Sequence, residues 1–544
     1  MSDDLDAVRF PELVIGIAGP LGIDIEEINQ TLADCLATVG YSAIPIHITR
    51  EIASVETSVA KPESSDFGTE IEFKMNHASE VCRKYGAADT LMRFAIRAIR
   101  NHRASVAASS PAREQEVEST TPPEEQVQPR TAYVIRQLKR PEEVRLLRKV
   151  YGKQFILISA YGSAESRKKI LETKLTKSLP FNTPEHEISA RSEQLMHRDQ
   201  HEEIDSHGQH LRDTFHLADV FIDGVSKAEM TAMTSRFVNA LFGRADIGPT
   251  KSEYGMYAAK SASLRSTDLS RQVGAAIFTP EGEMIAQGCN EVPKAFGGTY
   301  WDGEEPDFRD IKLGEDPNDV LKKEVVRDLL ERLEAGGMLS ERAAEIGGAS
   351  NIVDALIRPA TQGSPEGHGC LSGAAVMELT EYGRVVHAEM CAICDAARLG
   401  RSVKGAVLYC TTFPCHNCTK HLLAAGISRV VYMEPYPKSK AKVLHQNEIE
   451  IERTIPSRVS FMPFLGISPL RYRDIFEKGK RKKDGLALRW IANEPRPLID
   501  TAAPTWVDLE IFELARLVGE IHARPDLHIS TEPDGEEPAS QQGD

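Results

Sequence analysis

The sequence lacks several features that define whole classes of protein. No apolar run approaches the roughly 18 residues that a membrane-spanning helix needs. The nine cysteines gather mainly around one stretch of the chain and do not form an evenly spaced disulfide framework. The first residues, Met1 to Asp4, are acidic and lack the charged-then-apolar order of a signal peptide. Together these features predict a protein of the reducing cytoplasm.

Positive charges are fewer than negative ones. The chain has 65 Lys and Arg against 81 Asp and Glu, a formal net charge of −16. This balance disfavours non-specific binding to the phosphates of nucleic acids. Only local basic runs, such as residues 478–483, remain as candidates for such binding. The 544 residues are enough for two to four domains.

The most informative stretch lies near residue 400. It contains His387 and Glu389 in an H-x-E pattern, followed after a helical run and an apolar strand by Pro-Cys-x-x-Cys with Cys415 and Cys418. One imidazole and two thiolates are three zinc ligands, and a catalytic zinc keeps its fourth position open for water. We expect Glu389 to carry protons rather than to bind the metal. This is the signature of the zinc nucleobase deaminases.

Two plainer interpretations of this stretch are a structural zinc site and a redox Cys-x-x-Cys pair. A structural site needs a fourth protein ligand, which Cys391, Cys394 or Cys410 could supply. The glutamate in the H-x-E position and the strand between the two halves favour the catalytic interpretation.

The flanking residues indicate how the ligands are brought together. The pattern predicts a helix over 390–399, a buried strand over 406–409, and a second helix that begins at Cys415 and ends before Gly426. Thiolates at a helix N-terminus are favoured by the backbone N–H groups and the helix dipole. We therefore expect two helix starts, on either side of one strand, to face a shared metal.

The N-terminal region reads as a strand over 13–17, a loop with Gly19 and Gly22, and a helix over about 25–39. With Gly16, this spacing resembles the opening of the deoxynucleotide and dephospho-coenzyme A kinases, whose loop cradles phosphate. The chain departs from that pattern at the lysine and Ser/Thr positions, which hold Ile25 and Glu26. A phosphate-binding nucleotide sensor, a degenerate structural domain and an active kinase all remain open.

Strands and helices alternate through the rest of this region to about residue 242, which predicts a largely parallel sheet. Residues 104–130 are rich in Ala, Ser, Pro, Glu and Gln without periodicity, and we expect them to be disordered. The segment 197–210, rich in His, Asp and Glu, could bind a metal but is more typical of a solvated helix face.

A β-hairpin is predicted over 273–289, with a turn at residues 280–282. This hairpin and the Arg-Ser and Arg-x-Val-Gly-Ala residues before it resemble the opening of the deoxycytidylate deaminases. In that family the Asn after the second strand binds the substrate sugar, which implies the same role for Asn290; by itself Asn290 would be a turn residue. Thr411 is a further expected nucleotide contact, and Tyr436 and Lys438 are candidates for base stacking and phosphate binding.

Residues 300–386 interrupt the usual path from this hairpin to the H-x-E motif. We expect a helical insertion, with helices over 319–333 and 351–357, that builds a subunit interface or a cover over the site. His368 and Cys370 are a weak candidate for a second zinc site. Residues 461–472 again resemble the deoxycytidylate deaminases, and the acidic tail from 530 is expected to be disordered.

The order of these parts resembles that of the bacterial anti-phage dCTP deaminases. The resemblance implies an α/β chain with a P-loop kinase-like parallel-sheet domain over 1–249, which is the regulatory half, and a three-layer α/β/α cytidine-deaminase-like domain over 250–529. It implies zinc-dependent deamination of dCTP, and perhaps dCMP, that depletes dCTP during infection. It further implies a homo-oligomer, hexameric in related enzymes, and control by a signal that in some members is a small RNA.

Three alternatives stay open beside this function. The first is a housekeeping dCMP deaminase, the second a deaminase acting on nucleic acid, and the third a regulatory or binding protein with an inert deaminase fold. The negative charge and the hairpin count against a nucleic-acid substrate, and the intact motif counts against an inert fold.

Overall fold

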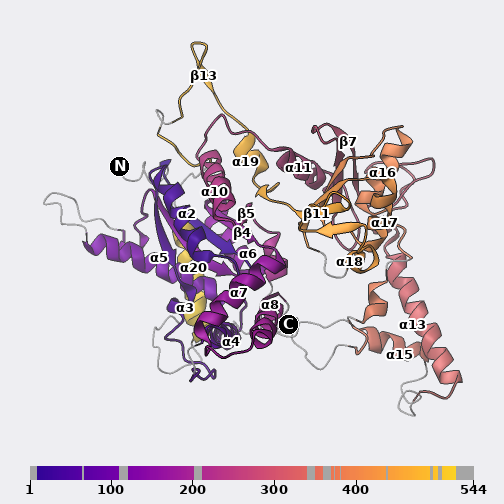
Figure 1. Ribbon diagram of the computed structural model, residues 1–544, viewed down its shortest axis with the longest axis horizontal. Coiled ribbons are helices and arrows are strands. Elements are labelled where there is room, and N and C mark those ends of the chain that lie inside the picture. The colour runs from indigo at the N-terminus through magenta and orange to yellow at the C-terminus, as the bar shows by residue number, and fades with distance from the viewer. Residues whose placement is uncertain are drawn as a thin grey trace, which may run out of the picture. The chain divides into compact units, whose positions relative to one another are not determined.

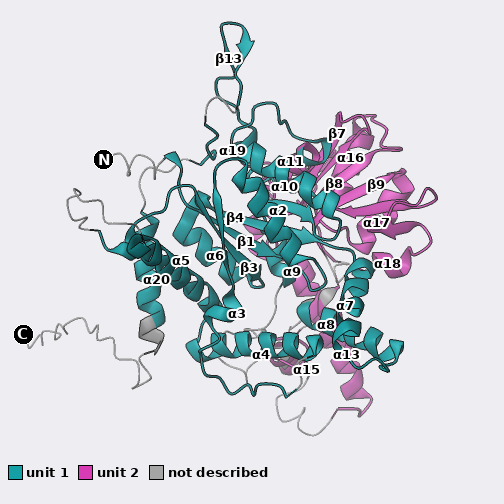
Figure 2. Cartoon of the chain, turned by 60° about the vertical axis from the view of Figure 1, so that its left-hand side comes forward, with its two compact units in different colours: residues 1–253, 465–544 teal, residues 254–464 magenta. Residues whose placement is uncertain are grey.

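The computed structural model describes residues 9–63, 66–109, 121–200, 211–339, 349–358, 369–372, 374–379, 382–435, 439–490, 494–499 and 505–521. The chain divides into two compact units (Figure 2). Unit 1 comprises residues 1–253 and 465–544, and unit 2 comprises residues 254–464. Within the described residues, no helix is both long and apolar enough to cross a membrane.

Unit 1 is built on a six-stranded sheet of order β12-β5-β4-β1-β3-β2. Five strands are parallel, and the short β12 pairs antiparallel with β5 at one edge. The strands are β1 (Leu13–Ala18), β2 (Ser42–Ile46), β3 (Thr131–Leu138), β4 (Phe155–Tyr161), β5 (Val220–Asp223) and β12 (Gly466–Ile467). Because β1 is buried along its whole length, it reads as a continuous apolar run, as expected for a parallel sheet covered on both faces.

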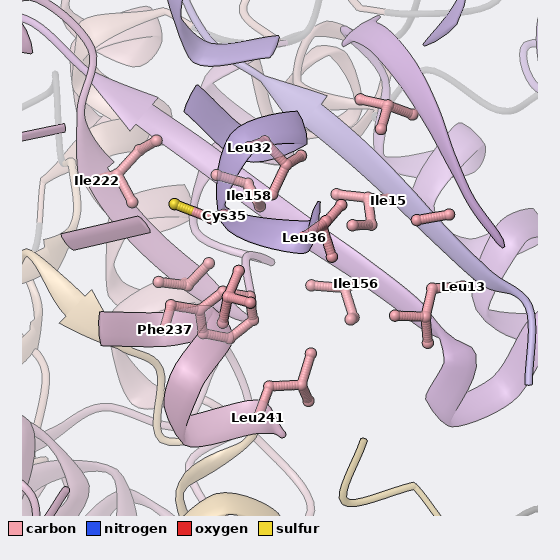
Figure 3. Packing of buried hydrophobic residues seen from close by; sticks show 14 of the residues in the cluster. Leu13, Ile15, Leu32, Cys35, Leu36, Ile156, Ile158, Ile222, Phe237 and Leu241 are labelled. Carbon is pink, nitrogen blue, oxygen red and sulfur yellow. The ribbon is translucent and has the colours of Figure 1, made fainter. Parts of the chain in front are cut away.

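Helices cover this sheet, as the strand–helix alternation predicts (Figure 1). The helices α2 and α10 pack against each other, and their apolar residues join those of the central strands in one core, including Leu32, Leu36 and Phe237 with Ile156 and Ile158 (Figure 3). The longer helices of unit 1 are α2 (Ile25–Ala37), α4 (Phe67–Tyr85), α5 (Thr90–Ser109), α6 (Pro141–Tyr151), α7 (Ala164–Ser178), α8 (Glu185–Gln200), α10 (Lys227–Leu241) and α20 (Trp506–Ile521).

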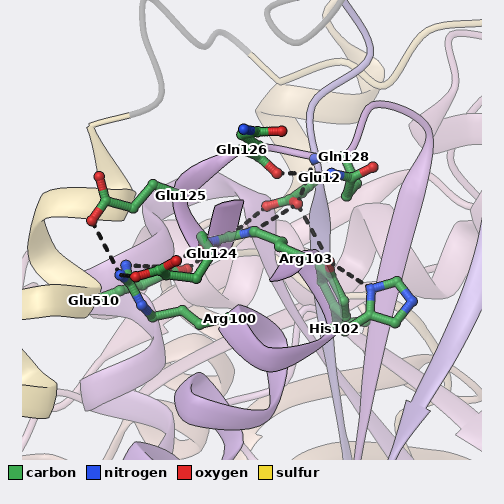
Figure 4. Close-up of polar contacts among 10 residues, drawn as sticks. Glu12, Arg100, His102, Arg103, Glu124, Glu125, Gln126, Gln128 and Glu510 are labelled. Atoms are coloured by element: carbon green, nitrogen blue, oxygen red, sulfur yellow. Dashed lines mark hydrogen bonds and ion pairs between the residues drawn. The ribbon is translucent and has the colours of Figure 1, made fainter. Parts of the chain in front are cut away.

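A buried ion cluster lies against α5 (Figure 4). Arg103, completely buried, donates to both carboxylate oxygens of Glu12, at 3.0 and 2.6 Å, and to both of Glu510, at 2.6 and 2.9 Å. Arg100 of the same helix contacts Glu125 at 3.1 Å. The Arg103 guanidinium is thus held between Glu12, just before β1, and Glu510 of the C-terminal helix α20.

This cluster corrects one expectation. Residues 104–130 were expected to be disordered, yet residues 104–109 complete α5, and residues 123–125 form a short 3₁₀ helix. The Gln128 N–H also donates to Glu12 at 2.8 Å. The low-complexity composition misled because ion pairs with arginines of α5 hold this segment, and periodicity does not report such pairs. Residues 110–120 lie outside the described part of the chain.

The boundary expected at residue 529 also differs from the structure. Residues from 465 onward group with unit 1, where β12 adds to the sheet and Arg471 donates to Asp219 at 3.0 Å. Glu513 of α20 pairs with Arg93, at 3.4 Å, and with Lys149, at 2.8 Å. The C-terminal segment therefore completes the sheet edge and the core of the first unit. The tail from 530 lies outside the described residues.

Unit 2 holds a second six-stranded sheet of order β10-β11-β9-β8-β6-β7. The hairpin β6–β7 pairs antiparallel with β8, and β8, β9, β11 and β10 run parallel. The strands are β6 (Gly274–Phe278), β7 (Met284–Cys289), β8 (Val407–Thr412), β9 (Arg429–Glu434), β10 (Ile449–Ile451) and β11 (Val459–Pro463). The predicted hairpin over 273–289 is confirmed.

Helices lie on both faces of this second sheet. Ala392 of α16 (Ala388–Arg398) and Leu422 of α17 (His416–Ala425) share a core with Leu408. Side chains on the opposite face, such as Tyr409, meet α11 (Lys251–Ser263), where a Cβ on Gly255 would lie 2.4 Å from the Tyr409 ring. The result is the expected α/β/α layering.

The described part of the segment between residues 300 and 386 contains several helices. It contains α12 (Asp310–Leu313), α13 (Pro317–Ala335), α15 (Ala349–Ile357) and a 3₁₀ turn at Ala375–Glu378. The two helices expected here are therefore present, each a little longer than predicted.

Candidate metal centre and active site

Three of the predicted zinc ligands come together in unit 2. His387 is the N-cap residue of α16, and Cys415 is the N-cap residue of α17, with Cys418 one turn further along. The His387 Nδ1 atom lies 3.3 Å from the Cys415 Sγ atom and 3.4 Å from the Cys418 Sγ atom. The two predicted helix starts thus converge on one point.

This trio fits a zinc ion. Its three donor atoms all lie within 4.8 Å of one another. Zinc–donor bonds of about 2.0–2.3 Å in a tetrahedron place neighbouring ligand atoms roughly 3.5–3.8 Å apart, close to the spacing here. Among the described residues, it is the one group of three or more metal-ligating side chains so arranged. With three protein ligands, the site has the composition of a catalytic rather than a structural zinc.

The local electrostatics favour one ready thiolate. A hydrogen bond from the Cys418 thiol lowers the pKa of Cys415 to about 4, against the opposing effect of burial, and His387 adds to the lowering. The hydrogen bond to Cys415 in turn raises the pKa of His387. The Cys418 N–H also donates to the Cys415 sulfur, at 3.4 Å. The neighbouring Cys418 thiol and His387 therefore prepare this ligand for metal.

Glu389 lies beside the metal ligands without belonging to them. Its side chain is 4 % exposed, and its Oε2 atom accepts from Cys418 Sγ at 3.3 Å. Burial raises the pKa of this carboxyl group, and the negative charge of Cys415 raises it further. A carboxyl group with a raised pKa can both take up and release a proton near neutral pH.

These residues face a cavity of about 300 Å³. His387, Glu389 and Cys415 line it together with Asn290 and Phe413. The Phe413 ring packs edge-on against Tyr432, with ring centroids 4.9 Å apart, so this wall is fixed from behind. The cavity therefore joins a metal-binding corner to an apolar wall and a set of polar groups.

Asn290 lies in this cavity, but part of its side chain is already engaged. Its Oδ1 atom accepts from the Val273 N–H at 2.7 Å, and its Nδ2 atom donates to the Arg271 carbonyl at 2.8 Å. An amide side chain has two N–H donors and two acceptor lone pairs. The two bonds hold Asn290 in place and leave one N–H and one lone pair for a ligand.

Thr411 and Thr412 lie on opposite faces of β8. The Thr411 hydroxyl accepts from the Gly274 N–H at 3.0 Å, and Thr411 is not among the residues lining the cavity. Thr412 does line it. Since side chains alternate along a strand, and Leu408 and Cys410 face the core beneath α16, the period-two pattern places Thr412 on the cavity side. That pattern was available in the sequence.

Two arginines that the sequence analysis did not single out as ligands also line the cavity. Arg271 contacts Glu434 at 2.9 Å, and Arg384 contacts Asp310 at 3.0 Å. Asp310 and Asn318 of the insertion line the cavity as well. The insertion thus contributes directly to the site, in keeping with the expected cover. Arg384 stands three residues before His387 in the sequence, and this short separation indicates that the two side chains belong to one site.

Several other predicted positions have different outcomes. Tyr436, Lys438 and His368 lie outside the described residues, while Cys370 is exposed and belongs to no metal-ligating group there. The Cys410 thiol points into the sheet, where it donates to the Val431 carbonyl. It does not supply a fourth metal ligand in the described part of the chain.

The three glycines of the N-terminal loop lie in unit 1. Gly16 is inside β1, where a Cβ would lie 3.0 Å from the side chains of Leu138 and Phe155, so its absence allows close strand packing. Gly19 and Gly22 lie in the loop between β1 and α2, and Gly22 has φ +91°. The predicted strand–loop–helix order is present.

Comparison with known proteins agrees with the geometry of unit 2. Residues 249–434 match the model of the cytidine and deoxycytidylate deaminase zinc-binding region. Zinc is accordingly the metal of the His387–Cys415–Cys418 site.

Short stretches of the chain are similar to curated relatives. They are 47% identical over 55 residues to the deoxycytidylate deaminase of Enterobacteria phage T4 (10% of this chain, 28% of that protein) and 37% identical over 67 residues to the ComE operon protein 2 of Bacillus subtilis (12% and 35%). The human deoxycytidylate deaminase is 41% identical over 54 residues (10% and 29%). The chain thus spans about a third of the length of these relatives.

Solved structures give a weaker likeness. The dCMP deaminase of cyanophage S-TIM5 is 18% identical, with 40% of this chain and 100% of that chain covered, at a TM-score of 0.21. A structure described as a study of A-to-I editing by tRNA:A34 deaminases is 14% identical, with 40% of this chain and 100% of that chain covered, at a TM-score of 0.18. These scores are too low to discriminate between substrates.

Proposed function

We propose that this chain hydrolytically deaminates a free deoxycytidine nucleotide, dCTP and also dCMP, to the deoxyuridine nucleotide and ammonia. One observation carries the proposal: a buried carboxyl group, Glu389, stands next to a His-Cys-Cys metal site at the wall of a cavity of about 300 Å³. That volume is at the lower end of the range typical of small-molecule sites.

Each residue has a distinct part in the proposed reaction. His387, Cys415 and Cys418 hold zinc, which when bound supplies a water acidic enough to attack at neutral pH. Glu389 takes one proton of the attacking water and passes it to the ring N3; it then takes the remaining proton, from the hydroxyl now on C4, and delivers it to the departing amine. The reaction consumes one water and replaces the C4 amine by a carbonyl oxygen, with ammonia as the leaving group.

The cavity walls would position the nucleotide. Phe413 offers an apolar surface to the base, and the remaining N–H of Asn290 is available to the sugar. Arg271 and Arg384 are the basic side chains of the lining and are our candidates for phosphate contacts. Both are paired with carboxylates in the ligand-free chain, so phosphate would have to compete for them.

The biological role is proposed on the order of the parts in the sequence. A nucleotide-loop domain ahead of a deoxycytidylate-type deaminase resembles the anti-phage dCTP deaminases, and we propose that the chain depletes dCTP during phage infection under control of its N-terminal half. A housekeeping dCMP deaminase remains the second candidate, and the name deoxycytidylate deaminase carried by two relatives supports dCMP as its substrate.

Ammonia release by the zinc-loaded chain tests the proposal. dCTP, dCMP, CTP and a cytosine-containing oligonucleotide are offered in parallel, with Glu389→Gln protein as the blank. Turnover of dCTP supports nucleotide depletion, and turnover of dCMP alone supports the housekeeping role. Turnover of the oligonucleotide alone, or of none of the four by a zinc-replete chain, contradicts the proposal.

A further inference from the structure

The glycine loop of unit 1 already holds an anion. In this loop, which joins β1 to α2, the Leu21 N–H donates to the Asp199 Oδ2 atom at 2.7 Å. Asp199 comes from the last turn of α8, 178 residues away in sequence, and is completely buried. A backbone N–H of a glycine loop after a buried strand is the kind of donor that binds phosphate oxygens in other proteins.

A lysine completes this arrangement from a neighbouring strand. Lys139 follows directly after β3, and its Nζ atom donates to the Asp199 Oδ1 atom at 2.7 Å and to the Gly19 carbonyl at 2.8 Å. Because β1 and β3 are adjacent and parallel, their carboxyl ends meet at the same edge of the sheet, where open α/β sheets bind ligands. Lys139 thus brings an ammonium group to a loop whose own sequence lacks one.

The pair opens onto a cavity large enough for a nucleotide. The cavity has a volume of about 470 Å³, and six basic and four acidic side chains line it. Two of the four carboxylates accept hydrogen bonds from backbone N–H groups. Asp199 accepts from Leu21 in the loop, and Asp24 accepts from Glu27 at the start of α2, at 3.2 Å. With Asp199 withdrawn, the basic excess of the lining would rise from two to three.

A buried ion pair is a poor source of stability, since desolvation of the two charges offsets most of their attraction. Asp199 and Lys139 therefore need a further explanation, and their position supplies one. Each Asp199 oxygen receives a donor, one backbone N–H and one ammonium, as a terminal phosphate oxygen would.

We propose that the glycine loop is a polyphosphate site that Asp199 fills in the ligand-free chain. A phosphate chain, free or carried by a nucleotide, displaces the Asp199 carboxylate from Leu21 and Lys139. Lys139 then takes the part of the lysine that is missing at Ile25. The site is distinct from the deaminase cavity, and its occupancy is independent of whether the chain deaminates anything.

Calorimetric titration of the full-length chain with inorganic tripolyphosphate tests this proposal. Asp199→Asn removes the competing charge. If Asp199 leaves only about a tenth of the wild-type loops free to bind, the apparent dissociation constant for tripolyphosphate is about tenfold higher than the intrinsic one. The dissociation constant of the variant should therefore be at least about tenfold lower than that of wild type. Asp213→Asn is the matched control, because Asp213 is an exposed acid of the same unit outside this cavity; it should leave the constant unchanged. The double variant Asp199→Asn/Lys139→Met should lose this gain in affinity for tripolyphosphate.

The outcomes separate cleanly. An Asp199→Asn chain that folds, by circular dichroism, yet binds no tighter than wild type overturns the proposal, and so does an equal gain in the Asp213→Asn control. If Asp199→Asn does not fold, Asp199→Ser, which removes side-chain volume as well as charge, takes its place. A titration with ATP then identifies the source of the phosphate chain: tighter binding than tripolyphosphate assigns the site to a nucleotide, and weaker binding assigns it to free polyphosphate.

Discussion

Removal of the carboxylate of Glu389 should abolish turnover and spare the metal. Glu389→Gln keeps the size and polarity of the side chain but cannot exchange the protons that the proposed reaction needs. General acid–base catalysis contributes about 10²- to 10⁴-fold, and since one group serves several transfers here, we expect a loss near the upper end, about 10⁴-fold in kcat. Zinc should stay near one per chain, because none of the three metal-binding atoms is altered.

The assay pairs ammonia release with metal analysis of the same sample. Asp395→Asn is the matched control, since Asp395 lies on the same helix, α16, and is ion-paired with Arg398 at the surface, at 2.9 Å. It should leave both turnover and zinc unchanged. A Glu389→Gln protein that retains zinc and works within tenfold of wild type would refute the assigned role, and one that loses zinc would mean that the carboxylate supports the metal.

Three other substitutions probe the site and the fold. Cys415→Ala should lose both zinc and turnover, as seen by metal analysis and ammonia release, whereas retained zinc would contradict its role as a ligand. Arg384→Met should raise KM for the nucleotide by about 10- to 100-fold with a smaller effect on kcat, because a charge-assisted hydrogen bond is lost; Arg401→Met, a surface arginine outside the cavity, should change neither. Arg103→Met removes the nearest cation from two buried glutamates and should lower the free energy of unfolding by about 3–5 kcal/mol in urea denaturation. Neutral replacement of both glutamates in that variant should restore most of the loss, and a cost below 1 kcal/mol would show that the cluster is dispensable.

Local signals predicted the metal site well. His387, Cys415 and Cys418 are brought together by two helix starts around one strand, and all three features lie within about thirty residues of sequence. The strand order of the hairpin and the layering of unit 2 followed from patterns of similar range. Of the two threonines at the end of β8, Thr412 lines the cavity and Thr411 does not, as alternation along the strand predicts.

The features that escaped prediction depend on distant pairs. Arg103 meets Glu510 across 407 residues, and Asp199 meets the loop at Leu21 across 178, and neither hydrophobic periodicity nor a short motif reports such contacts. For the same reason, the low-complexity composition near α5 does not report the ion pair between Arg100 and Glu125 that holds this segment. In the sequence alone, charged side chains that are buried in ion pairs look the same as charged side chains on the surface.

The return of the C-terminal segment to unit 1 has a consequence for the order of assembly. By the time residue 464 is made, every strand of the unit 2 sheet has been synthesised, whereas the first sheet still lacks its edge strand β12, and Arg103 still lacks Glu510. All strands of unit 2 are therefore available before unit 1 receives its last strand and the second of the two carboxylates that bind Arg103. A fragment of residues 254–464 is consequently the natural one for isolating unit 2, and a fragment of residues 1–253 leaves an open sheet edge and separates Arg103 from Glu510.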